Sequence, residues 1–110
     1  MKSIYKVHWT ENALLELKKT FVYLEENFTG KELNVLALEI EKVSKLLSLN
    51  PKLFPIVNLE LQIRRAVVLK FNNLYYTFNE NGVYVLSFYS NRQKIHQSFK
   101  IFLFVMLKQN

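Results

Sequence analysis

The chain has 110 residues, enough for one domain and too few for two, and half of them are hydrophobic, which excludes disorder as a global description. Cysteine is absent and glycine occurs twice, so disulfides, thiolate metal sites, cysteine nucleophiles and glycine-rich phosphate loops are excluded. The net charge is +6, and the two histidines lack metal-ligand spacing, so we expect neither a metal nor a cofactor.

The amino-terminal stretch MKSIYKVHW lacks the charged region, long apolar run and small-residue cleavage site of a signal peptide. No stretch approaches the ~18 apolar residues of a membrane span, so we expect a soluble, cytoplasmic protein with no membrane partner. Ile4–Trp9 is rich in β-branched and aromatic residues and predicts the first strand.

Two amphipathic helices are predicted next. Thr10 is the expected N-cap of the first helix, in which apolar residues recur at helical spacing as far as Phe28. Thr29 and Glu32 have the spacing of a capping box, which starts a second apolar stripe that Asn50-Pro51 ends. Because so few residues join the two helices, we expect an antiparallel helical hairpin.

The apolar period changes from 3.6 to 2 in the second half of the chain. Three strands are predicted there, at Leu61–Lys70, Leu74–Asn79 and Val83–Tyr89. The segment before them, Lys52–Glu60, is expected to be a connection. Asn72-Asn73 and Asn81-Gly82 are the expected turns between the strands, since Asn-Gly is a strong hairpin signal. Three strands joined by two tight turns predict an antiparallel meander.

The order of strand, helix, helix and three strands indicates a two-layer α+β fold, in which the helical hairpin covers one face of an antiparallel sheet. We assign residues 1–98 to one domain. Residues 99–110 form a tail, in which Phe99–Leu107 carries a single charge and is expected to pack on the domain or on a partner.

The excess positive charge lies entirely in the second half of the chain. Residues 1–60 hold eight Lys/Arg and eight Asp/Glu, whereas residues 61–110 hold seven Lys/Arg and only Glu80 as an acid. A field of one sign favours an acidic partner, either nucleic acid or an acidic protein. The alternative is that the basic residues only keep a hydrophobic chain soluble.

Several short motifs follow one another in a recognisable order. The chain opens with YKVHWTENALLELKKTFVYLEENF, a short strand followed by Thr-x-x-Ala and an amphipathic helix. A strand with Ile63-Arg64-Arg65, a strand with Leu74-Tyr75-Tyr76, the Asn-Gly hairpin and Asn91-Arg92-Gln93 come after it. Over residues 4–95 this order resembles the RelE/ParE superfamily of toxins from type II toxin–antitoxin systems. The resemblance implies a small basic toxin, held inactive by an acidic antitoxin.

The resemblance also implies one of two activities. Toxins of the RelE kind cleave messenger RNA within the ribosome without a metal, whereas those of the ParE kind poison DNA gyrase. On the RelE pattern, Arg92 matches the arginine after the last strand, and Arg64 and Arg65 lie near the basic pair of the first meander strand. Asn73 and Ser98 stand where a second arginine and a tyrosine are expected, so two catalytic parts are replaced.

These replacements favour a toxin that inhibits growth by binding an essential target, with DNA gyrase as the first expectation. The residues expected to bind the antitoxin or the target are Arg64, Arg65, Arg92 and Lys94. The assembly is expected to be a homodimer or a heterotetramer with the antitoxin. One alternative is a ribosome-dependent mRNA endonuclease with Arg92, Arg65 and Arg64 as catalytic cations. Another is a decayed toxin that binds its antitoxin and harms nothing.

Structural roles for the same residues stay open. Arg64 and Arg65 could discourage edge pairing of their strand, and Arg92 could close a salt bridge to Glu80. His96 could act as a general base or lie solvated in a basic tail, whereas His8 is expected to be structural. Tyrosines of the predicted strands could stack on RNA bases, pair across strands or fill the core: Tyr75, Tyr76, Tyr84 and Tyr89.

Overall fold

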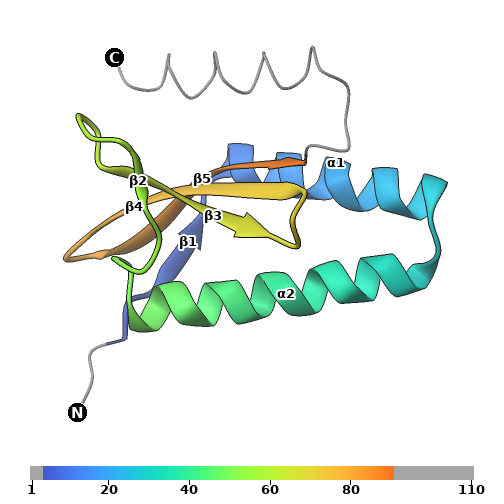
Figure 1. The fold of residues 1–110 in the computed structure, drawn as a ribbon, viewed down its shortest axis with the longest axis horizontal. Coiled ribbons are helices and arrows are strands. Elements are labelled where there is room, and N and C mark those ends of the chain that lie inside the picture. The colour runs from blue at the N-terminus through green and yellow to red at the C-terminus, as the bar shows by residue number, and fades with distance from the viewer. Residues whose placement is uncertain (1–3, 91–110) are drawn as a thin grey trace.

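The computed structural model describes residues 4–90 of the 110. Its elements are β1 (Val7–Trp9), α1 (Glu11–Asn27), α2 (Gly30–Leu49), β2 (Ile56–Asn58), β3 (Ile63–Val68), β4 (Asn72–Asn79) and β5 (Gly82–Ser90). The strands form one sheet in the order β1-β5-β4-β3-β2, and the helices run in opposite directions beside it (Figure 1). The predicted α+β class, with a helical hairpin on a sheet, is confirmed.

Both predicted helix starts are present. The hydroxyl oxygen of Thr10 accepts a hydrogen bond from the Ala13 N–H at 3.1 Å and so caps α1. The Glu32 carboxylate accepts from the Thr29 N–H at 2.9 Å and also from the Thr29 hydroxyl, which forms the capping box of α2. The hydrogen bond from the Thr29 hydroxyl is the main cause that lowers the pKa of Glu32 from its ordinary value.

The sheet differs from the predicted antiparallel one in two ways. β1 pairs with β5 in parallel, which the long chain between them permits, whereas the other neighbouring strands are antiparallel. A short strand, β2, also lies within the segment Lys52–Glu60, for which the sequence predicts only a connection. β2 has three residues, too few for a period of 2 to be recognised, and its pairing with β3 defines it.

The β3–β4 turn lies earlier in the chain than the sequence predicts. Leu69 and Lys70 adopt left-handed backbone conformations, with φ angles of 53° and 72°, and they reverse the chain. Asn72 and Asn73 are buried residues of β4 instead. The Asn72 side chain donates to the Val68 carbonyl at 3.0 Å, so it supports the turn from within the strand.

The predicted hairpin between β4 and β5 is present, and its turn lies one residue earlier than Asn81-Gly82. Glu80 and Asn81 form the turn, and Asn79 faces Gly82 across the strands. Gly82 has a φ of 148°, and a Cβ there would lie 2.7 Å from the Lys6 carbonyl oxygen. Only glycine therefore fits at the point where β5 meets the entry to β1.

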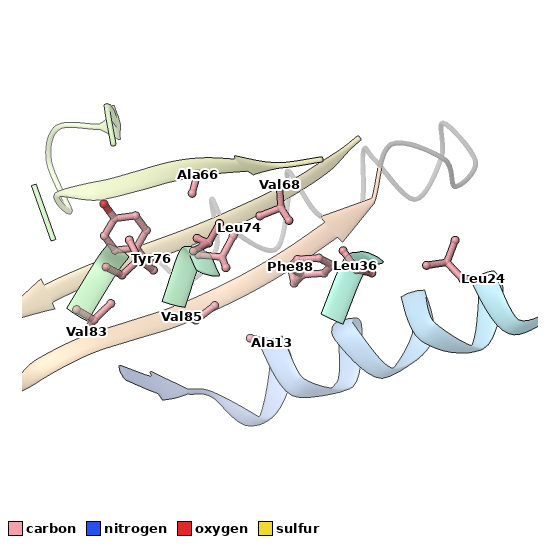
Figure 2. Close-up of a cluster of buried hydrophobic side chains, with 12 residues drawn as sticks. Ala13, Leu24, Leu36, Ala66, Val68, Leu74, Tyr76, Val83, Val85 and Phe88 are labelled. Atoms are coloured by element: carbon pink, nitrogen blue, oxygen red, sulfur yellow. The ribbon is translucent and has the colours of Figure 1, made fainter. Parts of the chain in front are cut away.

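The core lies between the helices and one face of the sheet (Figure 2). Alternate strand residues point to the helices, and full burial of such side chains stabilises a fold by roughly 1.5–3 kcal/mol each. The buried cluster comprises Ala13, Leu24, Leu36, Val43, Leu47, Ala66, Val68, Leu74, Tyr76, Val83, Val85 and Phe88. Among the described residues, no helix has the length and hydropathy needed to cross a bilayer.

Polar side chains of α1 complete the edge of β5 beyond the end of β1. The Asn12 side-chain amide donates to the Leu86 carbonyl at 3.2 Å. Glu16 Oε1 accepts from the Phe88 N–H at 3.1 Å and from the Ser87 hydroxyl at 2.9 Å. These contacts satisfy groups that a further strand would otherwise pair. Burial is the main cause that raises the pKa of Glu16 above its ordinary value.

Candidate functional site

The candidate site lies on the sheet face opposite the core, which we call the outer face. Because side chains alternate along a strand, the residues between core residues point away from the helices. Neither of the two described helices covers this face (Figure 1). The outer face includes His8 of β1, Arg65 and Val67 of β3, Tyr75 and Thr77 of β4, and Tyr84 of β5. Asn73 of β4 and Tyr89 of β5 lie on the same face by register and are buried there.

Arg65 is the cation of this face. Its side chain is exposed, and its Cα partner across the strands is Tyr75. The Arg65 backbone N–H donates to the Pro55 carbonyl at 3.1 Å, which fixes the strand under it. Within residues 4–90, the guanidinium forms no hydrogen bond or ion pair. A guanidinium left free in this way can bind a phosphate or carboxylate through two parallel hydrogen bonds.

Arg64 points to the other face and is occupied there. Its Nη1 donates to the carbonyl oxygens of Lys52 at 3.1 Å and Phe54 at 2.6 Å. Its guanidinium carbon lies 5.8 Å from the centroid of the Phe78 ring, within the range of a cation–π contact. Arg64 Nε is buried and has no hydrogen-bond partner within the described chain. The two neighbouring arginines are therefore not equivalent, and Arg64 holds the loop after α2.

An aromatic pair lies on the outer face near its β1 edge. The rings of His8 and Tyr84 are stacked, with centroids 5.0 Å apart and an angle of 16° between their planes. The His8 ring also lies over Gly82, where a Cβ would come within 3.0 Å of it. His8 thus has the structural role expected from the sequence, and it packs on the same face of the sheet as Arg65.

The four tyrosines expected as candidates for base stacking divide between two environments. Tyr76 is fully buried on the core side and donates its hydroxyl to the Pro51 carbonyl at 2.6 Å, which makes it structural. Burial raises the pKa of its phenol above the ordinary value. Tyr89 is also buried, but its pairing with Asn73 places it on the outer face and not in the core cluster. Tyr75 and Tyr84 remain half-buried on the outer face, where a planar group could stack on them.

Several predicted site residues lie outside the described residues: Arg92, Lys94, His96, Ser98 and the Phe99–Leu107 tail. Asn73, which stands where the RelE pattern expects a second arginine, is buried in β4 between Val67 of β3 and Tyr89 of β5. An amide there can hydrogen-bond but cannot stabilise the negative charge of a phosphate as a cation does.

The charge of the described residues is close to balanced. Residues 4–90 hold ten Lys/Arg and all nine Asp/Glu of the chain. Most of the remaining positive charge is therefore carried by four residues that follow β5: Arg92, Lys94, Lys100 and Lys108. No group of three or more His, Cys, Asp or Glu residues that could hold a metal occurs in the described part of the chain.

A second surface feature is a groove on the helical hairpin. It has a volume of about 260 Å³ and an apolar lining with Lys18 and Glu25 at its rim. Leu14 and Val22, which line it, are 51% and 43% exposed. The groove suits the apolar anchors of an amphipathic segment from a partner.

Glu16 is the residue that sequence reasoning missed. Asn12 and Glu16 are four residues apart and lie beside the apolar stripe of α1, where carboxylates are rarely half-buried without a partner. This polar pair next to an apolar stripe was the available signal, but its partners in β5 are more than 70 positions away in the chain.

Comparison with known proteins finds a similar structure but no matching sequence family. No protein-family model matches the sequence, and no curated protein matches it significantly. The structure is similar to the solution structure of the conserved hypothetical protein HP0894 from Helicobacter pylori, with a TM-score of 0.54 and 16% sequence identity. The similarity covers 82% of this chain and 98% of that one. It shows that the two chains share an α+β fold.

Proposed function

We propose that this protein is the toxin of a type II toxin–antitoxin pair and that it arrests growth by binding an essential target, with DNA gyrase as the first candidate. The RelE-like fold and the basic second half of the chain support the general role. The observation that favours binding over cleavage is the state of the two arginines of β3. Arg64 is bound to loop carbonyls, so Arg65 is the one free guanidinium of the described outer face.

RNA cleavage without a metal requires a base, an acid and cations that stabilise the charge of the phosphorane. Among residues 4–90, the outer face offers one cation and no carboxylate. Asn73 supplies an amide where the nuclease pattern has an arginine. An exposed guanidinium beside half-buried tyrosines suits recognition of an acidic or planar surface on a large partner.

The proposed inhibitor is an acidic antitoxin. Its apolar side chains would enter the groove of the helical hairpin, and its carboxylates would pair with Arg65, Arg92 and Lys94. Neutralising these cations would block the target-binding face and relieve repulsion among them.

The proposal is tested with purified toxin in two assays, gyrase supercoiling and cleavage of messenger RNA on translating ribosomes. We expect inhibition of supercoiling and no cleavage. Arg65→Ala should weaken the inhibition about tenfold or more, since a charge-assisted hydrogen bond contributes about 1.5–3 kcal/mol. Lys42→Ala, which removes an exposed cation from α2, is the matched control and should leave inhibition unchanged.

The alternative function is a RelE-type endonuclease with Arg92 and Arg65 as phosphate-stabilising cations. It is supported by the position of Arg92 in the sequence, two residues after the end of β5, in a chain whose excess positive charge is concentrated there. Cleaved messages with supercoiling intact would replace the binding proposal by this one. Arg92→Ala would then abolish cleavage while antitoxin binding persists.

A further inference from the structure

One row of the outer face is buried at one end, although neither described helix covers this face (Figure 1). Val67 of β3 pairs with Asn73 of β4, and Asn73 pairs with Tyr89 of β5. The exposed fraction falls along this row, from 50% at Val67 to 8% at Asn73 and 6% at Tyr89. Because side chains project from a sheet, a tyrosine ring on an open face would be largely exposed. The row therefore has a cover, and the cover lies over β5.

The elements within residues 4–90 do not account for this cover. β1 pairs with residues 83–85 of β5, so it ends before the row begins. The polar side chains of α1 occupy the edge of β5, where Asn12 bonds the Leu86 carbonyl and Glu16 bonds the Phe88 N–H. The core cluster lies on the opposite face and does not include Tyr89. The cover is therefore to be sought in the chain beyond the described residues.

The chain that continues from β5 has the composition and the length to cover this row. Phe99–Leu107 holds eight apolar residues and one lysine. Residues 91–98 link it to Ser90, the neighbour of Tyr89, and eight extended residues span at most ~26–29 Å. The row crosses three strands, a width of only about 10 Å. Phe99–Leu107 can therefore reach every residue of the row.

The other open places for an apolar segment do not explain the burial of Tyr89. The edge of β5 beyond β1 is occupied by Asn12 and Glu16, so a further strand cannot pair there. The groove of the helical hairpin is lined by residues of the helices, and a segment bound there would leave Tyr89 open. Docking on the outer face is the arrangement that covers Tyr89.

We propose that Phe99–Leu107 docks on the outer face of its own chain, over Asn73 and Tyr89 and against the exposed Val67. The contact removes apolar surface of both the segment and the sheet from water, which stabilises it. Arg65 lies outside the contact, in the next row of the same face, and remains exposed. The docked segment thus borders the open part of the outer face on the β5 side. The proposal does not depend on the toxin assignment.

The test is nitration of tyrosine by tetranitromethane in the full-length chain, with the modified residues located by mass spectrometry. We expect Tyr89 to react slowly in the unsubstituted protein. In Phe102→Asp/Leu103→Asp, which places two charges at the centre of the segment, it should react at least about tenfold faster. Gln109→Asp/Asn110→Asp adds the same charges beyond the segment and should leave Tyr89 protected. Tyr76 is fully buried in the core, so its lack of reaction establishes that each variant is folded.

The same rate, measured over a range of protein concentrations, identifies the chain that supplies the cover. Protection of Tyr89 that is constant in a monomer supports docking within one chain, whereas protection lost on dilution would assign the cover to a second copy and overturn the proposal. It is equally wrong if Tyr89 reacts as fast as the half-buried Tyr84 in the unsubstituted protein. A third contrary result is continued protection of Tyr89 in the double Asp variant. Phe102→Ala/Leu103→Ala is a milder variant that should also speed the reaction of Tyr89, and it replaces the Asp variant if Tyr76 becomes reactive there.

Discussion

Lys70 lies in a backbone conformation that favours glycine. Its φ of 72° lies in the left-handed region, and so does the φ of 53° of the neighbouring Leu69. Leu69 packs against the core, which offsets its strain, whereas Lys70 is exposed and its Nζ lies 5.6 Å from the centroid of the Phe71 ring. The β3–β4 turn is therefore held in place by the pairing of the two strands, although neither Leu69 nor Lys70 favours this backbone conformation.

Lys70→Gly should raise the free energy of unfolding by about 0.5–1 kcal/mol, because relief of strain exceeds the added entropy of the unfolded chain. Urea denaturation measures this change. Lys70→Ala removes the same side chain but keeps the Cβ, so it should give no gain. Equal effects of the two substitutions would contradict strain at this residue.

Glu16 gives the fold a pH dependence whose sign follows from burial. Since the pKa of Glu16 is raised in the folded state, the folded protein binds this proton more tightly than the unfolded chain does. The stability contributed by the protonated carboxyl is complete below the ordinary pKa of 4.5 and is lost as the pH rises through the raised value.

Glu16→Gln keeps an acceptor for the Phe88 N–H without a buried charge. The difference in free energy of unfolding between Glu16→Gln and the unsubstituted protein should therefore shift in favour of the variant as the pH rises from about 4 to 7. Urea denaturation at each pH measures this difference. Glu16→Ala removes the acceptor and should destabilise by about 1–3 kcal/mol at both ends. A Gln variant that is less stable than the unsubstituted protein at pH 7 would refute the assigned burial effect.

At the scale of elements, the loop after α2 depends on two side chains of the sheet. Tyr76→Phe removes the hydrogen bond to the Pro51 carbonyl and should lower the free energy of unfolding by about 0.5–1.5 kcal/mol. The Arg65 amide, which donates to Pro55 in the same segment, should then exchange faster with deuterium. Tyr84→Phe is the matched control on the outer face and should change neither quantity. If the Arg65 amide exchanges at an unchanged rate in Tyr76→Phe, the loop does not depend on the Tyr76 hydrogen bond.

The helices and the hairpin turn could be predicted because their signals are local. Thr10, the Thr29–Glu32 pair and Asn81-Gly82 act on groups within a few residues of themselves. The parallel pairing of β1 with β5 depends on partners distant in the chain, so no local pattern encodes it. β2 pairs with the nearby β3, but its three residues are too few to show a period of 2. The Leu69-Lys70 turn has neither glycine nor asparagine, and it is imposed by the pairing on either side.

The candidate site could be predicted only in part for the same reason. The sequence places Arg64 and Arg65 together on one strand, but the register of β3 decides which of them faces the core. The loop carbonyls that bind Arg64 come from residues ten and twelve positions away. The stacking of His8 on Tyr84 joins the two ends of the fold and has no sequence signal.

At the scale of the whole molecule, the net positive charge is concentrated in the sequence after β5. The described residues 4–90 are nearly neutral, whereas the twenty residues after β5 carry four basic residues and no acid. Association with an acidic partner should therefore depend mainly on that segment and on Arg65. A variant with Arg92, Lys94, Lys100 and Lys108 replaced by Gln should lose most of the salt dependence of antitoxin association, measured by stopped flow, because electrostatic steering is screened by salt. An unchanged salt dependence would place the steering charges within residues 4–90.

The central claim is that the protein arrests growth by binding the machinery of DNA replication. It is tested most directly by inducible expression in bacterial cells, followed by parallel pulse-labelling of DNA and protein synthesis. We predict early loss of DNA synthesis while translation continues, and a weaker loss with Arg65→Ala. Early arrest of translation with cleaved messages would contradict the claim and identify Arg65 and Arg92 as parts of a nuclease.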